Sequence, residues 1–348
     1  MDPITHMLIG AAVAQVPKKS TATLSVKQRA SIGALASIFP DIDYLLFFLA
    51  PLDFLAYWHR AETHSLILAP FWAWMLATLI RRYCAWPQQR ALIFWICLIA
   101  ILSHDISDSL TTFGTQWFAP ISDHRVSFNL LFVMDGYFTL TIIIALMLLV
   151  RWRNPARSWL AFVVPASYLA FVLMLKLAAY LQLPTLEEQT NTRERMLLPQ
   201  PFSPFYWHII DATAQGYNQA YMALTKDMVG AKLSEMLNAG AGPNHYQKPN
   251  DLSWNHYSIL PADQQARQEA RQVWQHKKFQ AFREFAVYPV FHAYQTSANN
   301  TCVWFSDLRY HWPTFLPSFR FGMCRSGTQT WQLYRIKYFS SVQTEPID

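Results

Sequence analysis

Long apolar runs with few charged residues fill the first half of the chain, and they constrain its fold more than any other feature. Five segments, residues 31–50, 64–80, 91–110, 130–150 and 159–181, reach or approach the roughly 20 residues that a helix needs to cross a bilayer. A shorter apolar segment, residues 4–16, precedes them. Only 14% of the chain is charged, against about 25% in soluble proteins. A membrane protein is therefore predicted.

The composition changes once, near residue 181, where ordinary polar sequence begins. We therefore predict a mainly α fold with two domains: a polytopic transmembrane helical domain in residues 1–181, with about five spans plus the N-terminal membrane segment, and a smaller α+β domain in residues 182–348. Residues 262–286 have a helical pattern, whereas Tyr334 and Ile336 alternate with charged residues as in a half-buried strand.

The basic residues indicate the orientation in the membrane. Alternate loops are rich in Lys and Arg, namely Lys18, Lys19, Lys27, Arg29, Arg81, Arg82, Arg90, Arg151, Arg153 and Arg157, whereas residues 51–63 and 111–129 contain only Arg60 and Arg125. The positive-inside rule places the first set in the cytoplasm. We expect a multi-pass protein of a bacterial inner membrane with residues 182–348 in the periplasm. The net charge of +6 comes from these loops, so no nucleic-acid partner is expected.

The N-terminus resembles a signal peptide, because an apolar stretch ends in Ala12-Val13-Ala14. However, Asp2 and no Lys or Arg precede that stretch, which argues against a signal peptide. Cys302 and Cys324 fall in the predicted periplasmic domain, where disulfides form. They are predicted to be linked, with two buried free thiols as the alternative.

Ionisable residues gather at the predicted outer ends of the apolar segments. Such residues are costly inside a membrane and usually serve a function. They are His6, Asp41, Asp43, His59, Arg60, His64, His104, Asp105, Asp108 and Asp135. Taken singly, each histidine is as readily explained by an interhelical hydrogen bond and each aspartate by a helix cap. As a set on one side of the bilayer, they favour a site.

The spacing of these residues supports a metal site. His104 and Asp108 are four residues apart, so they share one face of a helix. Pro40 is expected to break the helix and let Asp41 and Asp43 converge. His59 and His64 flank the entry to a helix, where Thr63 and Ser65 are candidate helix caps or hydroxyl partners of the ligands. Mixed imidazole and carboxylate donors suit Zn²⁺, Mn²⁺ or Fe²⁺. One or two divalent ions, with zinc or manganese preferred, are predicted.

Several separated motifs resemble one family. They are MDPITHMLIGAAVA at the N-terminus, PDID at residues 40–43, HRAETHSL at 59–66 and HDISDSLTTFGTQWFAPISDHRVSF at 104–128. Together they resemble the YdjM-type predicted membrane-bound metal-dependent hydrolases. The resemblance covers about residues 1–135 and implies metal-site roles for His6, Asp41, Asp43, His59, His64, His104 and Asp108. Hydrolase activity in that family is itself largely inferred.

These features predict a hydrolase that uses metal-activated water. Asp105 or Asp108 is the expected general base, and Arg60 and Arg125 are expected to bind an anionic group. The partners would be membrane lipid and an outer-leaflet lipid ester, phosphoester or lipid-linked substrate. An intramembrane protease is disfavoured because neither HExxH nor a GxGD pair is present. The alternatives are a metal-ion or proton transporter that uses the same cluster, and an interaction protein whose exported domain binds an envelope partner.

Overall fold

The structure is a computed structural model. It describes residues 1–16, 24–84, 89–151, 158–184, 192–236, 245–297, 299–313, 315–327, 329–338, 340 and 342–347. The chain forms two compact units. The N-terminal unit comprises Met1–Leu45 and Trp58–Met174, and the C-terminal unit comprises Leu46–Tyr57 and Leu175–Asp348. The predicted boundary after residue 181 stays a prediction.

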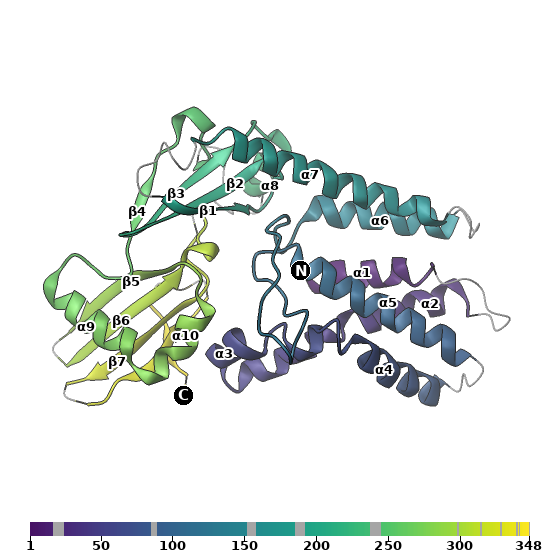
Figure 1. Ribbon diagram of the computed structural model, residues 1–348, viewed down its shortest axis with the longest axis horizontal. Coiled ribbons are helices and arrows are strands. Elements are labelled where there is room, and N and C mark those ends of the chain that lie inside the picture. Colours follow the sequence, from purple (N-terminus) through teal and green to yellow (C-terminus); the bar gives the residue numbers. More distant parts are fainter. Residues whose placement is uncertain are drawn as a thin grey trace. The chain divides into compact units, whose positions relative to one another are not determined.

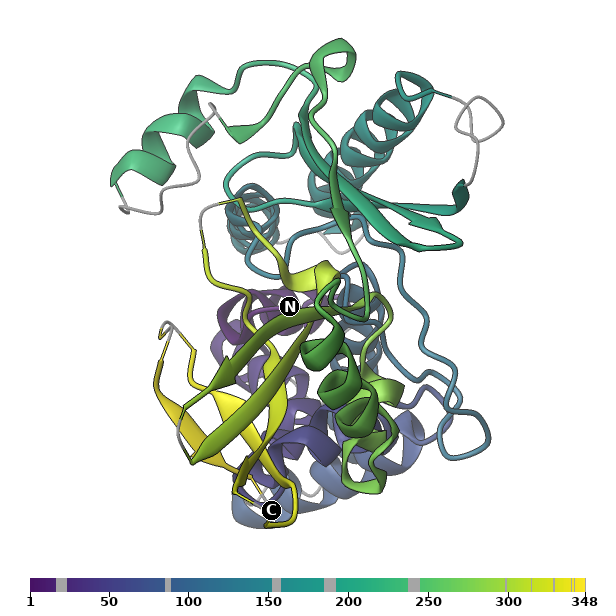
Figure 2. The ribbon, with the colours of Figure 1, turned by 90° about the vertical axis from the view of Figure 1, so that its left-hand side faces the viewer.

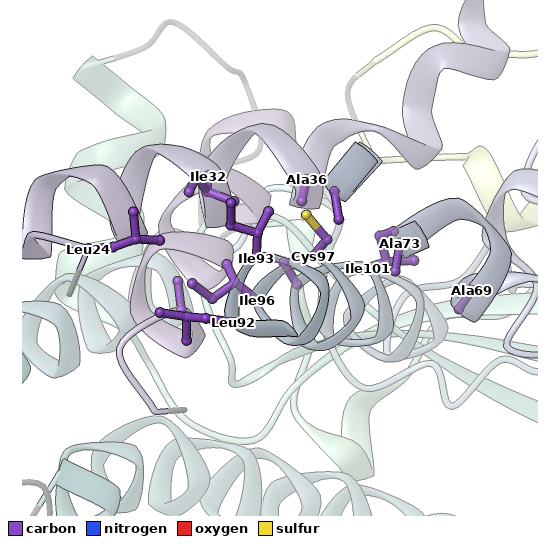
Figure 3. Close-up of a cluster of buried hydrophobic side chains, with 13 residues drawn as sticks. Leu24, Ile32, Ala36, Ala69, Ala73, Leu92, Ile93, Ile96, Cys97 and Ile101 are labelled. Carbon is purple, nitrogen blue, oxygen red and sulfur yellow. The ribbon is translucent and has the colours of Figure 1, made fainter. Parts of the chain in front are cut away.

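The N-terminal unit is helical (Figure 1). Its elements are α1 (Pro3–Val13), α2 (Val26–Ile38), the 3₁₀ helices η1 (Pro40–Phe48) and η3 (Glu62–His64), α4 (Ala69–Cys84), α5 (Arg90–Ser109), α6 (Gly136–Arg151), η5 (Ser158–Phe162) and α7 (Val163–Leu181), of which η1 and α7 continue into the C-terminal unit. Helices α1, α2 and α4 all pack on α5. Apolar side chains of α5, among them Ile93, Ile96 and Ile101, are fully buried against Ala36 and Ala73 (Figure 3).

The helices include two that are long and apolar enough to cross a membrane, residues 90–109 and 158–181, or up to four if each bent pair counts as one span. The predicted segment 31–50 falls on one bent pair, residues 26–38 and 40–48, with a bend of 44°. The predicted segment 64–80 covers mainly the second helix of the other pair, residues 51–64 and 69–84, which is bent by 70°. Pro40 ends the first straight helix as predicted, because it lacks an amide donor.

The segment predicted to span at residues 130–150 is shorter than expected. The amides of Leu130 and Leu131 donate to the carbonyl of Leu110, outside any helix. Asp135 then caps α6 by accepting from the amide of Phe138 at 2.8 Å. As a result α6 has 16 residues, about 24 Å of helix.

Two glycines allow α1 and α2 to approach closely. A Cβ atom on Gly10 would lie 2.2 Å from the carbonyl oxygen of Gly33, and a Cβ on Gly33 would lie 2.2 Å from that of Gly10. Small residues that permit such contacts are typical of helix pairs in membranes. The contact lies alongside Ser37, whose Cβ would be 2.4 Å from a Cβ on Gly10.

Replacing Gly10 with alanine is expected to lower the stability of the N-terminal unit by about 1–3 kcal/mol, because the added methyl forces the two helices apart. Gly136 is the matched control, since a Cβ there meets no atom within 4 Å. Thermal unfolding in detergent should show a lower midpoint for Gly10→Ala and little change for Gly136→Ala. Equal midpoints in the two variants would contradict the close contact.

The C-terminal unit contains two antiparallel sheets, each with its strands in sequence order (Figure 2). The first holds β1 (Thr192–Pro199), β2 (Tyr206–Thr213), β3 (Gly216–Ala223) and β4 (Asn255–Tyr257), and the second holds β5 (Pro289–Thr296), β6 (Asn300–Asp307), β7 (Arg320–Ser326), β8 (Gln332–Ile336) and β9 (Thr344–Pro346). The helical elements are α3 (Pro51–Asp53), the π-helical turn η2 (Phe54–Trp58), α8 (Met228–Met236), η7 (Pro249–Asp251), α9 (Gln264–Gln275), η8 (Lys277–Phe279), α10 (Gln280–Phe285) and η9 (Leu308–Tyr310). The strand predicted around Tyr334 is thus confirmed, and residues 262–286 are mainly helical as predicted but form α9, η8 and α10 in place of one helix.

The second sheet carries the predicted disulfide. Cys302 on β6 and Cys324 on β7 face each other in the strand register and are joined by an S–S bond. An aromatic cluster that includes Phe279, Phe282 and Phe305 is fully buried beside the sheet. This unit therefore has a hydrophobic core of its own.

Candidate metal centre

The predicted site residues lie at one end of the helices of the N-terminal unit. His6 is in the first turns of α1, Asp41 and Asp43 follow α2, His64 precedes α4, and His104 and Asp108 are in the last turns of α5. Helices α1 and α4 begin at this end of the unit, whereas α2 and α5 finish there, which brings these residues together. The described basic residues Lys27, Arg29, Arg81, Arg82, Arg90 and Arg151 lie at the opposite helix ends, whereas Lys18, Lys19, Arg153 and Arg157 lie outside the described residues.

Four side chains converge on one point. One donor atom from each of Asp41, His64, His104 and Asp108 lies within 4.8 Å of the other three. We call these residues the four-donor centre. His104 and Asp108 meet as the predicted pair on one helical face, with Nε2 3.4 Å from Oδ2. His64, His104 and Asp108 are fully buried, and the side chain of Asp41 retains 16% exposure.

The spacing of the donor atoms fits a tetrahedral ion. The Nε2 atoms of His64 and His104 are 3.1 Å apart. Each of them lies 3.4–3.7 Å from the nearer carboxylate oxygens of Asp41 and Asp108. Donors about 2.0–2.1 Å from a tetrahedral zinc ion would be about 3.3 Å from one another. Two carboxylates would also neutralise a divalent charge.

The hydrogen bonds of the histidines leave both Nε2 lone pairs directed at this point. His104 Nδ1 lies 2.5 Å from the carbonyl oxygen of Ser37, so it must donate, and Nε2 is then the acceptor. His64 Nδ1 faces the hydroxyl of Thr63 at 3.0 Å and Asp43 Oδ2 at 3.7 Å, which favours the same tautomer. Two lone pairs 3.1 Å apart repel each other unless a proton or a metal ion lies between them, and the two neighbouring carboxylates add the charge and donors that suit a divalent ion. The residues present therefore fit a metal ion.

Both oxygens of Asp108 are held in place by neighbouring cations or donors. Oδ2 belongs to the four-donor centre and lies 2.9 Å from Arg60 Nε. Oδ1 faces His6 Nε2 at 3.0 Å and the ammonium group of Met1. His6 also stacks on the ring of His104, with centroids 3.7 Å apart. The structure thus places His6 behind Asp108, in contact with the oxygen that does not face the other donors.

Asp43 and His59, both predicted as ligands, form an adjacent pair outside the four-donor centre. Asp43 Oδ2 lies 3.2 Å from His59 Nδ1 and accepts from the amide of Arg60 at 3.0 Å. That amide belongs to a residue with φ of +58°, an uncommon conformation for arginine. The carboxylate therefore fixes the chain between His59 and His64, and through it the position of His64.

The remaining predicted residues occupy separate places. Asp105 is fully buried on α5, and within the described part of the chain neither of its carboxylate oxygens has a hydrogen-bond partner. Arg125 donates to the carbonyl of His59 at 2.9 Å and stacks over Phe113. Asp135 caps α6 and accepts from the hydroxyl of Tyr168 on α7 at 3.0 Å, so its role is to join two helices.

Some partners in the centre escaped the sequence analysis. The carbonyl of Ser37 orients His104, but a backbone acceptor has no signature in side-chain identity. Thr111 accepts from Arg60 Nη1 at 2.9 Å, three residues after Asp108, and this spacing at a helix end is its only sequence signal. Thr63, in contrast, is placed against His64 as predicted.

Comparison with known proteins places the chain in a family. Residues 1–179, about half of the 348, match the family described as YdjM inner membrane protein. The chain is also similar to the inner membrane protein YbcI of Escherichia coli (strain K12), with 34% identity over 96 residues. That match covers 27% of this chain and 54% of YbcI, so the chain spans about half the length of this curated relative. No solved structure matches. The chain carries the candidate metal centre within the matched residues, and it belongs to the YdjM family of inner membrane proteins.

Proposed function

We propose that the protein is a membrane-bound, metal-dependent hydrolase. The observation that carries this proposal is the four-donor centre, in which two imidazoles and two carboxylates meet at ligand spacing within a bundle of apolar helices. A divalent ion bound there would supply Lewis-acid chemistry, polarising a substrate oxygen and acidifying water. Zinc or manganese fits the mixed donors.

The side chains assign different tasks to the predicted catalytic residues. Asp108 is one of the residues of the four-donor centre, so Asp105 is the better candidate for the general base that takes a proton from water. Arg60 contacts Asp108 and Thr111, and Arg125 donates to the carbonyl of His59. Both guanidinium groups remain candidates for binding an anionic substrate group. The partly exposed Asp41 marks the side from which the donors are reached.

We propose that this end of the helices faces the periplasm, together with residues 182–348. The described basic residues at the opposite helix ends support this orientation through the positive-inside rule, and the disulfide of Cys302 and Cys324 supports an oxidising compartment. The exposed Cys84 lies at the basic end. Labelling of Cys84 by an impermeant maleimide in intact cells would show that the protein has the opposite orientation.

The substrate class follows from this location. We infer an ester or phosphoester of an outer-leaflet lipid or a lipid-linked compound, because the donors lie at the ends of membrane helices. Two exposed apolar side chains of η1, Ile42 and Leu45, follow Asp41 in the sequence. They are suited to contact acyl chains rather than water.

The test uses the purified full-length protein with zinc or manganese and a fluorogenic phospholipid in vesicles of phosphatidylethanolamine and phosphatidylglycerol. Metal-dependent product release by the wild type and none by His64→Ala is expected. Ion flux across the same vesicles is measured in parallel. Metal-dependent ion flux without hydrolysis would contradict the hydrolase and support the transporter.

A further inference from the structure

Helix α8 of the C-terminal unit turns its large apolar side chains outward, and it stands out at the upper left of Figure 2. Met228 and Met236 are 84% and 74% exposed, and Val229 and Leu233 are exposed as well. At about 100° per residue, these four positions share one arc of about 140° around the helix. A surface helix normally turns such an arc toward the core. The orientation of α8 is the reverse.

Small residues hold α8 in this orientation. Gly230 and Ser234 are buried on the opposite side of the helix, and a Cβ atom on Gly230 would lie 2.5 Å from the carbonyl oxygen of Phe202. Asp227 fixes the first turn, because its Oδ1 accepts from the amides of Val229 and Gly230, each at 3.0 Å. Rolling the helix to bury the methionines would press larger side chains against that carbonyl. The outward face is therefore a consequence of specific packing.

The same unit contains the end of a candidate membrane span. Residues 158–181, which end with α7, have a mean hydropathy of 2.0. The part of α7 from Leu175 onward belongs to the C-terminal unit, and its side chains Leu177 and Leu181 are exposed, as in a helix that faces lipid. Only residues 182–191 separate α7 from β1. The unit is thus tied to a bilayer and already presents a lipid-facing surface at α7.

We propose that α8 lies in the surface of that bilayer, with its four exposed apolar side chains among the acyl chains next to the headgroups. Four side chains on a helix of nine residues are too few for a stable protein interface, which buries about 1,200–2,000 Å². A small apolar face suffices for lipid, because the α7 anchor makes the contact intramolecular. Lys232, in the same arc, can extend its ammonium group to the headgroups. The proposal is independent of the metal centre and of the proposed activity.

The experiment places a fluorescent probe on this face of the full-length protein. Met236→Cys is labelled with nitrobenzoxadiazole in a Cys84→Ser background, in which the remaining free thiol, Cys97, is buried. The protein is reconstituted at one copy per nanodisc in phosphatidylcholine with or without bromine on its acyl chains. Bromine quenches only a probe that contacts those chains. Gln272→Cys is the matched control, because Gln272 is an exposed position on α9, another helix of the same unit.

Brominated lipid should quench the probe at Met236 and leave the probe at Gln272 unchanged. Adding Leu233→Asp should abolish the quenching, because a charge among acyl chains is costly, whereas Glu235→Gln at the edge of the arc should retain it. Equal quenching at Met236 and Gln272, or none at either, would refute the proposal. A blue-shifted probe at Met236 without quenching would also refute it. Protein would then cover the face: residues 237–244 if the shift occurs with one copy per disc, and a second copy if it needs two.

Discussion

His104→Ala and Asp108→Ala are each expected to leave the protein with no bound metal while it still inserts into the membrane. The two side chains supply half of the four-donor centre from one face of α5, with their donor atoms 3.4 Å apart. A site reduced to three donors, one of them partly exposed, holds an ion far less tightly. The double variant should lose no more than either single one, because the first substitution already empties the site.

Metal per chain and melting temperature are measured on the same detergent preparations. Ser103→Ala is the control on α5, because its hydroxyl donates only within the helix, to the carbonyl of Ala100. Metal content unchanged in both His104→Ala and Asp108→Ala, with a lower melting temperature, would support interhelical hydrogen bonding in place of metal binding. Asp108→Asn serves as a second variant, since it keeps the volume of the side chain.

Arg60→Ala is expected to lower the free energy of unfolding by about 3–5 kcal/mol, the effect of breaking a buried ion pair. Arg60 is 4% exposed and its Nε lies 2.9 Å from Asp108 Oδ2. Its Nη1 also donates to Thr111 at 2.9 Å. Without the guanidinium, the carboxylate of Asp108 stays buried with less compensation. A bound divalent ion replaces part of that charge, so the loss should be smaller in the presence of metal.

Two further substitutions separate the loss of the guanidinium contacts of Arg60 from the effect of its backbone conformation. Arg60→Lys should recover only part of the stability, because an ammonium group cannot reproduce the planar pair of contacts. Arg60→Gly also lacks the guanidinium, but it relieves the positive φ of +58°, so the difference between Gly and Ala reports the backbone alone. Denaturation in detergent measures all three. Near-normal stability of Arg60→Ala, together with a raised KM for the substrate, would instead indicate that Arg60 binds the substrate.

Local features of the centre were predictable from sequence because they depend on short-range rules. The pair His104 and Asp108 follows from helical periodicity, and the break at Pro40 follows from its missing amide. The separation of the candidates into donors and supporting residues was not predictable. Whether His6 contacts the ion or the far oxygen of Asp108 depends on how α1 packs on α5, and periodicity within one helix does not reveal the packing between helices.

Long-range packing accounts for the other differences. The sequence shows an apolar stretch from residue 130, but the amides of Leu130 and Leu131 bond to Leu110, and α6 begins only at Gly136. The sequence places residues 46–57 at the end of the predicted span 31–50 and in the loop 51–63 that follows. Their place in the C-terminal unit depends on contacts such as that of Phe47 with Arg335, more than 200 residues later, so no local pattern indicates it.

The order of the donors along the chain has a consequence for biosynthesis. Asp41 and His64 emerge from the ribosome first, and His104 follows His64 by 40 residues. A nascent chain that ends before α5 offers only two of the four donors, so it has little means of retaining an ion. Capture of a metal would then belong to a late stage of assembly, after the three chain segments that carry the donors have met. Scarcity of metal during growth would leave molecules that are inserted in the membrane but whose four-donor centre has not assembled. Proteases that survey the membrane can recognise such molecules.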